Sequence, residues 1–240
     1  RRGETLRLRT STDLINWQVS DPPITELPDW AKDAVPMVRS LWAPDICFFN
    51  GRYHLYYWAS SFGSNSSAIG LMTNVSLTAA SPDFEWVDRG MVIASGEEPH
   101  DHFNAIDPHV VVDADGQPWM SFGSFWTGIK LIRLEESTGL WHPDDREIRD
   151  LATRESPGAV EAPTIHHHRD HYYLFVSFDF CCRGVESTYN LRGGRSSDIA
   201  GPYVDRDGLP LLEGGGTVVL ETADRIIGPG HCDIVEDGEQ

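Results

Sequence analysis

Four segments of this chain place a proline within two residues of an acidic residue or a histidine, each just ahead of a strand-like run. They are Ala43-Pro44-Asp45-Ile46, Ile106-Asp107-Pro108-His109, Glu161-Ala162-Pro163-Thr164 and Gly228-Pro229-Gly230-His231, with prolines 64, 55 and 66 residues apart. Three segments lead into an apolar strand, a turn and an aromatic strand, and the fourth reaches Asp237-Gly238. A repeat of this length made of strands and turns predicts an all-β propeller with one blade per repeat.

The repeat also predicts where four polar side chains meet. The equivalent start of every blade's first strand faces the axis of a propeller, so Asp45, Asp107, Glu161 and His231 are expected around one point. Inverting cleavage of a glycosidic bond needs a carboxyl group as acid and a second one, about 6.5–9.5 Å away, on the opposite face of the sugar. Asp107 and Glu161 are the candidates for this chemistry. The alternative is that both belong to strand-initiating turns, and their recurrence at one blade position favours the catalytic interpretation.

Composition limits the class of protein and of partner. Hydrophobic content is 40%, with 8 Trp, 7 Tyr and 10 Phe, so residues 1–240 are expected to form one domain with a substantial core. The net charge of −18 argues against nucleic acid and anionic membranes, because phosphate binding needs Lys and Arg, and it fits a polysaccharide. No run approaches 18 apolar residues, so no membrane span is predicted. The four cysteines lack C-x-x-C spacing, and all are expected to be buried free thiols, including the adjacent Cys181 and Cys182.

Turn signals and the two ends complete the outline of the fold. Asn50-Gly51, Asp115-Gly116 and Asp237-Gly238 are typical hairpin turns, and one short helical turn is expected within residues 25–39. Residues 7–17 resemble the outer part of a blade without its inner strand, and the last residues enter a hairpin. We therefore expect the first and last blades to be incomplete. The sequence starts at Arg1 and shows no signal peptide.

The repeats and the segments between them form a set of motifs. They are Leu41-Trp42-Ala43-Pro44-Asp45-Ile46, Asn104-Ala105-Ile106-Asp107-Pro108, Ser121-Phe122-Gly123-Ser124-Phe125-Trp126, Glu161-Ala162-Pro163, Ser177-Phe178-Asp179 with Cys181-Cys182, Ser187-Thr188-Tyr189-Asn190 and Gly228-Pro229-Gly230-His231. Together they resemble glycoside hydrolase family 43, and the last five resemble its endo-1,5-α-L-arabinanase branch. The resemblance covers almost the whole chain. It implies a five-bladed β-propeller that cleaves internal α-1,5 linkages of arabinan with inversion.

The resemblance also implies roles for individual residues. Glu161 matches the general acid, and Asp107 matches the pKa-modulating aspartate that holds the acid in orientation. His231 matches the histidine on the axis that helps to hold an ion, usually calcium, through bound waters. The family's general base belongs to the inner strand of the first blade, so it is expected upstream of Arg1 and absent from this sequence. We interpret Asp45, which could be mistaken for that base, as a structural residue that binds neighbouring backbone.

Other side chains are candidates for binding the sugar chain. Aromatic rings suit the C–H face of a sugar, and hydroxyl and amide groups suit its hydroxyls. The candidates are Trp42, Phe103, Asn104, Ser124, Trp126, Ser187, Thr188 and Tyr189. For the aromatic residues the alternative is packing within a blade. The run His166-His167-His168 resembles a metal site only by composition, and we interpret it as part of an exposed hairpin because alternate residues of a strand face opposite ways.

Two other functions remain open from the sequence. One is an exo-acting arabinofuranosidase or β-xylosidase of the same family. The other is a non-catalytic carbohydrate-binding propeller, against which the pair Asp107 and Glu161 argues. The expected partners are arabinan and arabino-oligosaccharides, bound by a monomer that is secreted or periplasmic.

Overall fold

The regular structure of the chain is almost entirely β. The computed structural model describes residues 6, 8–38, 40–61, 63–96, 102–155 and 157–236. The strands are β1 (Leu8–Thr10), β2 (Gln18–Ser20), β3 (Leu41–Phe49), β4 (Arg52–Ser60), β5 (Ser67–Asn74), β6 (Val87–Ser95), β7 (His109–Val112), β8 (Pro118–Phe122), β9 (Ile129–Arg133), β10 (Arg149–Ala152), β11 (Val160–His168), β12 (His171–Phe178), β13 (Asn190–Ser196) and β14 (Thr217–Leu220). Within these residues the helices are α1 (Asp29–Ala34) and the 3₁₀ turns η1 (Gly184–Glu186) and η2 (Leu211–Glu213). The all-β prediction is confirmed.

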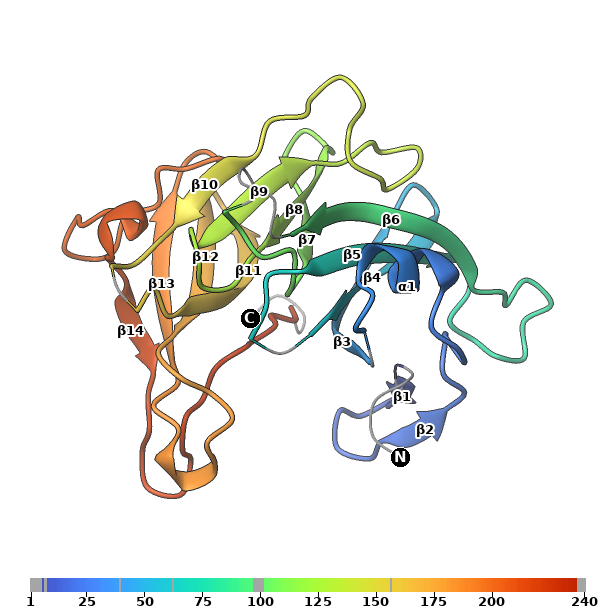
Figure 1. Cartoon of the computed structure of the whole chain (residues 1–240), viewed down its shortest axis with the longest axis horizontal. Coiled ribbons are helices and arrows are strands. Elements are labelled where there is room, and N and C mark those ends of the chain that lie inside the picture. The colour runs from blue at the N-terminus through green and yellow to red at the C-terminus, as the bar shows by residue number, and fades with distance from the viewer. Residues whose placement is uncertain are drawn as a thin grey trace.

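Three four-stranded antiparallel sheets follow one another along the chain (Figure 1). They contain β3 to β6, β7 to β10 and β11 to β14, and each sheet is built in chain order, whereas β1 and β2 form a separate pair. The first strands are adjacent in space, because β7 lies between β3 and β11. The starts of these three strands, where the proline segments lie, are therefore brought together.

Apolar side chains fill the space between neighbouring sheets. One cluster includes Tyr56, Ile69 and Met120, and a second includes Leu131 and Leu174, all fully buried. Burying a side chain of this size contributes about 1.5–3 kcal/mol. These clusters hold the sheets at a fixed angle to one another and so fix the positions of the inner strands.

Each proline segment contains the same backbone irregularity. The residue directly before the proline has a left-handed φ in all four: 31° at Ala43, 54° at Asp107, 53° at Ala162 and 61° at Gly228. The pairing register of β3 and of β11 also shifts at this point. Three of the four residues are not glycine, and such residues are uncommon in this region. The repeat seen in the sequence is therefore a repeated left-handed residue before the proline, which coincides with a bulge in β3 and in β11.

In three of the four segments, the residue directly after the proline links its strand to the next segment around the centre. Oδ2 of Asp45 accepts a hydrogen bond from Val110 N at 2.9 Å, Nδ1 of His109 accepts one from Ile165 N at 3.3 Å, and Oγ1 of Thr164 donates to Cys232 O at 2.6 Å. In each case one side chain satisfies a backbone group of the next segment around the centre. The same position of the repeat thus joins three pairs of neighbours.

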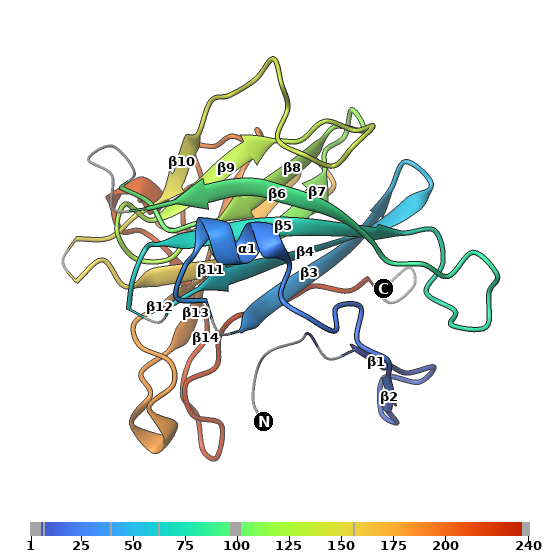
Figure 2. The same ribbon diagram turned by 45° about the vertical axis from the view of Figure 1, so that its right-hand side comes forward.

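Helix α1 covers part of the first sheet (Figure 2). The indole of Trp30 lies on Gly70 of β5, where an added Cβ would come within 2.2 Å of the ring. Trp30 Nε1 also donates to Asp88 at 3.2 Å. The short helical segment predicted within residues 25–39 is confirmed. The described helices are all too short or too polar to cross a membrane.

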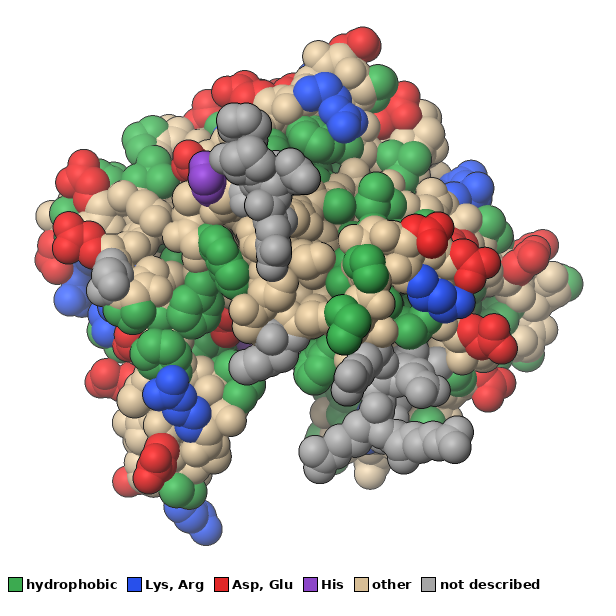
Figure 3. Space-filling view, viewed as in Figure 1, with side chains coloured by type: hydrophobic (Ala, Val, Ile, Leu, Met, Phe, Trp, Pro, Cys, Tyr) green, Lys and Arg blue, Asp and Glu red, His purple; other side chains and the backbone are tan. Residues whose placement is uncertain are grey.

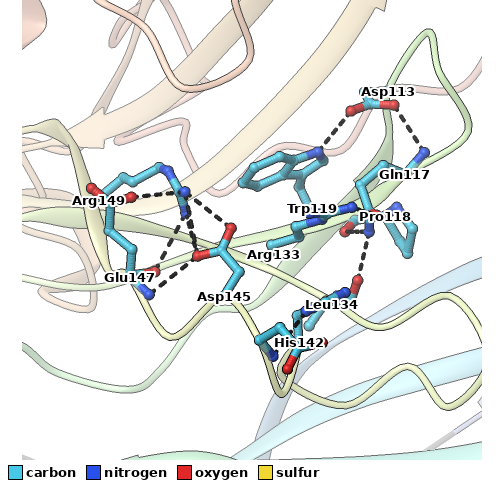
Figure 4. A network of polar contacts seen from close by, with 11 residues as sticks. Asp113, Gln117, Pro118, Trp119, Arg133, Leu134, His142, Asp145, Glu147 and Arg149 are labelled. Atoms are coloured by element: carbon cyan, nitrogen blue, oxygen red, sulfur yellow. Dashed lines mark hydrogen bonds and ion pairs between the residues drawn. The ribbon is translucent and has the colours of Figure 1, made fainter.

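A polar network fixes the turns of the second sheet (Figure 4). Asp113 accepts hydrogen bonds from Gln117 N at 2.9 Å and from Trp119 Nε1 at 2.8 Å, which closes the hairpin between β7 and β8. Arg149 pairs with Asp145 at 3.0 Å, and its guanidinium lies over the Trp119 ring. These contacts fix the end of the hairpin that is farthest from Pro108, and none of them involves a proline segment.

The fourth proline segment differs from the expectation. The sequence predicts an inner strand after Pro229, but residues 228–236 form no strand. The Asp237-Gly238 turn lies outside the described residues. A strand needs a hydrogen-bonded neighbour, and this segment is instead held by side chains, with Thr164 bound to Cys232 and Ser177 bound to His231.

The prediction of free thiols is wrong for two of the four cysteines. Cys181 and Cys182 are joined by a disulfide in the loop that follows β12. The backbone at Cys182 has a φ of 68°, so the loop turns sharply at this pair. Cys47 and Cys232 are free, as predicted, but they are half-buried rather than buried.

Candidate active site

The carboxylate of Glu161 is held from two sides at the start of β11. The Ser124 hydroxyl donates to Oε2 at 2.6 Å, and the Tyr189 hydroxyl donates to Oε1 at 2.8 Å. The backbones of Ser124 and Glu161 also form an isolated β-bridge. Two hydroxyl donors stabilise the charged carboxylate and restrict its rotation. The geometry therefore presents a positioned carboxyl group rather than a free surface one.

Asp107 lies close enough to Glu161 for the two charges to interact. Its side chain is only 6% exposed, and burial, followed by the charge of Glu161, raises the pKa of Asp107 to about 8. Contacts with the Trp58 indole and the Ala162 backbone act in the opposite direction. The Asp107 carboxyl therefore keeps its proton near neutral pH, beside the carboxyl group of Glu161.

Tyr189 and Ser177 bring the last segment of the chain to the same point. Tyr189 is buried, and its burial, together with the charge of Glu161, raises the pKa of its hydroxyl, so the hydroxyl remains a donor. The Ser177 hydroxyl accepts a hydrogen bond from His231 N at 2.8 Å. Gly230 lies against both, since a Cβ there would come within 2.3 Å of the Tyr189 ring. A glycine is therefore needed where this segment passes the site.

His231 is placed beside Glu161, as expected from the repeat. Partial removal from water lowers the pKa of His231, and the charges of Glu161 and Asp233 act in the opposite direction. In the described part of the chain, His231 does not belong to any group of three close metal-binding side chains. One imidazole with nearby carboxylates fits an ion that keeps most of its waters, and it does not fit a closed cage of six to eight oxygen ligands.

Asp45 has a structural contact of the expected kind. Its carboxylate binds Val110 N, and burial, ahead of the charge of Asp233, raises the pKa of Asp45 to about 7. Because its carboxylate is already engaged by the backbone of the next strand, Asp45 is not placed to activate water.

The aromatic sugar-binding candidates are divided by their exposure. Trp42 is 51% exposed and its ring stacks on Trp58 at 5.9 Å, and Trp126 is 44% exposed. Phe103 is 8% exposed and packs edge-on against Phe122 at 5.8 Å. The ring of Phe103 is part of the core, so it is not available to stack on a sugar. Sequence alone could not separate these cases, because nearness to Asp107 in the chain does not determine the side-chain direction.

Several polar candidates are occupied by other parts of the protein. Ser124 and Tyr189 bind Glu161, and Asn104 Oδ1 accepts a hydrogen bond from the Ser67 hydroxyl at 2.6 Å. In the loop before β13, the Ser187 hydroxyl accepts from Arg183 N at 3.0 Å, and the Thr188 hydroxyl accepts from Phe180 N at 3.3 Å. The last two shape the loop that contains the disulfide.

One positioning residue was not identified from the sequence. Arg154 Nη1 donates to Ala159 O at 2.9 Å and to Asp179 Oδ1 at 2.8 Å. Asp179 also accepts from Asn190 Nδ2 at 2.8 Å. This arginine thus holds the backbone that leads into Glu161. Its partner Asp179 belongs to one of the recognised motifs, but nothing in the sequence near Arg154 indicates the pairing.

Comparison with known proteins gives a consistent result. The family model "Glycosyl hydrolases family 43" matches residues 2–240. The chain is 46% identical over 231 residues to "Extracellular endo-alpha-(1->5)-L-arabinanase 1" of Bacillus subtilis, covering 96% of this chain and 69% of that protein. It is 41% identical over 239 residues to "Extracellular exo-alpha-(1->5)-L-arabinofuranosidase ArbA" of Cellvibrio japonicus, covering 95% and 69%. The solved structure "GH43 Endo-Arabinanase from Bacillus licheniformis" superposes with a TM-score of 0.90 at 47% identity, covering 97% of this chain and 78% of that one.

Proposed function

The chain belongs to glycosyl hydrolases family 43, and we propose that it cleaves internal α-1,5 bonds of arabinan with Glu161 as the general acid. It is a glycosidase. The observation that carries the residue assignment is the Glu161 carboxyl group, which is fixed by Ser124 and Tyr189 beside the buried Asp107. A lectin would gain nothing from a positioned carboxyl group beside a second, buried carboxyl group that retains its proton.

The proposed reaction is a single displacement with inversion. Glu161 gives its proton to the leaving oxygen as the glycosidic bond breaks, and water adds to the anomeric carbon from the other face. Ser124 and Tyr189 then stabilise the carboxylate that proton transfer leaves behind. The Asp107 carboxyl, which retains a proton up to about pH 8, lies beside Glu161 and keeps a proton at the site.

The base that activates water is a different group from Asp107 and Asp45. The Asp107 carboxyl is buried and keeps its proton up to about pH 8, and the Asp45 carboxylate is engaged by Val110 N. Burial of Asp107 and the backbone contact of Asp45 leave neither carboxyl group free to approach a water molecule. The proposal keeps the sequence-based assignment of the base to the inner strand of the first blade.

We also propose a fold for the whole domain, an ion site and the residues that contact the sugar. The three sheets of this chain are blades of a five-bladed propeller, and Trp42 and Trp126 are the exposed rings that stack on arabinose units. His231 helps to hold an ion through waters, and such an ion, when bound, supplies positive charge beside Glu161 and Asp233.

The names of two relatives indicate where the enzyme acts. Two of the relatives are named extracellular, and we extend secretion to the protein that carries this sequence, which acts as a monomer. Acidic side chains are spread over the visible face, with Lys and Arg in small groups (Figure 3). A neutral polysaccharide is compatible with such a surface.

The similarity to an exo-acting relative makes exo cleavage the second candidate. Product length separates the two modes. The protein carrying this sequence, incubated with linear arabinan, should first release oligosaccharides of many lengths with a rapid loss of viscosity. A single short product from the first time point would contradict the endo mode. Intact arabinan, with hydrolysis of another polysaccharide, would contradict the proposed substrate.

A further inference from the structure

Three metal-binding side chains meet at the end of β11 that is farthest from Glu161. The ligand atoms of His166, His168 and Glu236 all lie within 4.8 Å of one another. His166 Nε2 is 3.6 Å from Glu236 Oε1, and the two imidazole rings are 6.3 Å apart and nearly parallel. At about 3.3 Å per residue, this cluster is roughly 20 Å along the strand from Glu161. It is therefore separate from the candidate active site.

The strand geometry explains why two of three consecutive histidines converge. Residues two apart in a strand point to the same face, so His166 and His168 share a face and His167 points to the other. His167 packs on the ring of Tyr172 at 4.5 Å. Alternation, which made the histidine run look like an ordinary hairpin in the sequence, is what places two imidazoles beside one carboxylate. The third ligand comes from a segment 68 residues later, so the sequence could not reveal it.

We propose that His166, His168 and Glu236 form a binding site for a divalent transition metal, with zinc as the reference ion. Imidazole suits Zn²⁺, Cu²⁺ and Ni²⁺, whereas Ca²⁺ and Mg²⁺ prefer oxygen ligands. Two histidines and one glutamate give three protein ligands, and water takes the fourth position of a tetrahedral zinc ion.

The fit requires only a small closure of the side chains. Zinc–ligand distances of about 2.0–2.2 Å place tetrahedral ligand atoms roughly 3.4 Å apart. The His166–Glu236 distance of 3.6 Å is already close to this value. The largest separation in the group, within 4.8 Å, requires a shift of about 1 Å. His168 and Glu236 are both exposed, so their side chains can rotate.

A metal at this site would fasten two segments that are distant in sequence. Residues 231–236 form no strand and are otherwise joined to the third sheet through Thr164 and Ser177. Coordination by Glu236 would add a third attachment at the far end of β11. The site therefore acts on the stability of the fold, because an ion bound only by the folded state stabilises it.

Zinc titration of the full chain tests the proposal. After treatment with a chelator, the protein in excess Ca²⁺ is titrated with ZnCl₂ by calorimetry. The expected result is one equivalent of Zn²⁺ and a rise in Tm. His168→Ala and Glu236→Gln should each weaken binding by at least tenfold. His167→Ala, on the opposite face, should leave the affinity unchanged.

Two measurements keep the test decisive if a variant is unstable. Circular dichroism and the Tm without metal check that each variant is folded, and Co²⁺ substitution gives visible absorption bands typical of a tetrahedral site. Absence of binding in wild type would overturn the proposal. An affinity that is equal in wild type and His168→Ala, or insensitive to Glu236→Gln, would overturn it as well.

Discussion

Tyr189 donates its hydroxyl proton to Oε1 of Glu161 at 2.8 Å. The tyrosine is buried and precedes β13, whereas the glutamate lies at the start of β11. This bond crosses β12, so the orientation of the proposed acid depends on the packing of the whole third sheet. Catalysis and the stability of this sheet are therefore coupled through one hydroxyl group.

Removal of that hydroxyl should affect catalysis more than folding. Tyr189→Phe deletes one donor to the carboxylate, at a cost of about 1 kcal/mol in stability. We expect kcat on arabinan to fall by about tenfold or more with little change in KM, because the acid is less well oriented. The alkaline limb of the rate profile should move to higher pH, since the carboxylate is less stabilised.

The control for this variant is Tyr203→Phe. Tyr203 is also buried, and its hydroxyl donates to Ile199 O at 2.9 Å. It should lose similar stability with kcat unchanged. Equal effects of the two substitutions on kcat would remove Tyr189 from a positioning role.

Asp107→Asn should move the alkaline limb of the rate profile to lower pH. The substitution removes the carboxyl group that retains a proton up to about pH 8 beside Glu161, so activity should be lost at lower pH. Asparagine tolerates the left-handed backbone at this position better than most residues. The measurement is kcat/KM on arabinan from pH 4 to 9. An alkaline limb that does not move would contradict the assigned role of Asp107.

The pH dependence of stability should report Asp45. Its pKa is raised from 3.8 to about 7 by burial, so the folded state binds more protons than the unfolded state between these values. The stability contributed by protonated Asp45 is fully present below about pH 4 and is lost as pH rises through about 7. The free energy of unfolding of Asp45→Asn, measured by urea denaturation, should therefore increase relative to that of wild type by up to a few kcal/mol as the pH rises from 4 to 8.

Asp45→Ala is the matched comparison. Alanine also removes the titration, but it leaves Val110 N without its acceptor, which costs about 1–3 kcal/mol at every pH. If the free energies of unfolding of Asp45→Asn and wild type differ by the same amount at every pH, Asp45 does not titrate as described.

The ion at His231 should be distinguishable from the site on β11. Chelation should lower the Tm, and Ca²⁺ should restore the part that depends on His231, since a ligand bound by the folded state adds stability. His231→Ala should abolish the response to Ca²⁺ while leaving the zinc response intact. A full Ca²⁺ response in His231→Ala would remove this histidine from the ion site.

The spacing of the prolines was sufficient to predict three of the four expected inner strands, but not their detailed conformation. Pro108 directly precedes β7, whereas Pro44 and Pro163 lie within β3 and β11, and Pro229 is followed by no strand among the described residues. The positive φ before each proline was not predictable, because alanine and aspartate do not favour it and the surrounding contacts impose it. For the same reason the backbone contacts made by Asp45, His109 and Thr164 follow from the assembled fold rather than from a motif.

The placement of candidate site residues was predictable where a side chain belongs to the repeat. Glu161 and Asp107 come together because the inner strands do. Phe103 was misassigned because an aromatic residue beside an acidic one looks the same whether it faces the core or the solvent. Arg154 was missed because its partners are brought close only by the turn before β11.

The central claim is that Glu161 protonates the leaving group. Glu161→Gln keeps the shape of the side chain and removes the acid, so kcat/KM on arabinan should fall by about 10²–10⁴-fold. An arabino-oligosaccharide with a nitrophenol leaving group needs little protonation and should lose less than about tenfold. Glu186→Gln, an exposed carboxylate of η1, serves as the control. Losses of equal size on the two substrates would contradict the account, and a large loss confined to arabinan is the result it predicts.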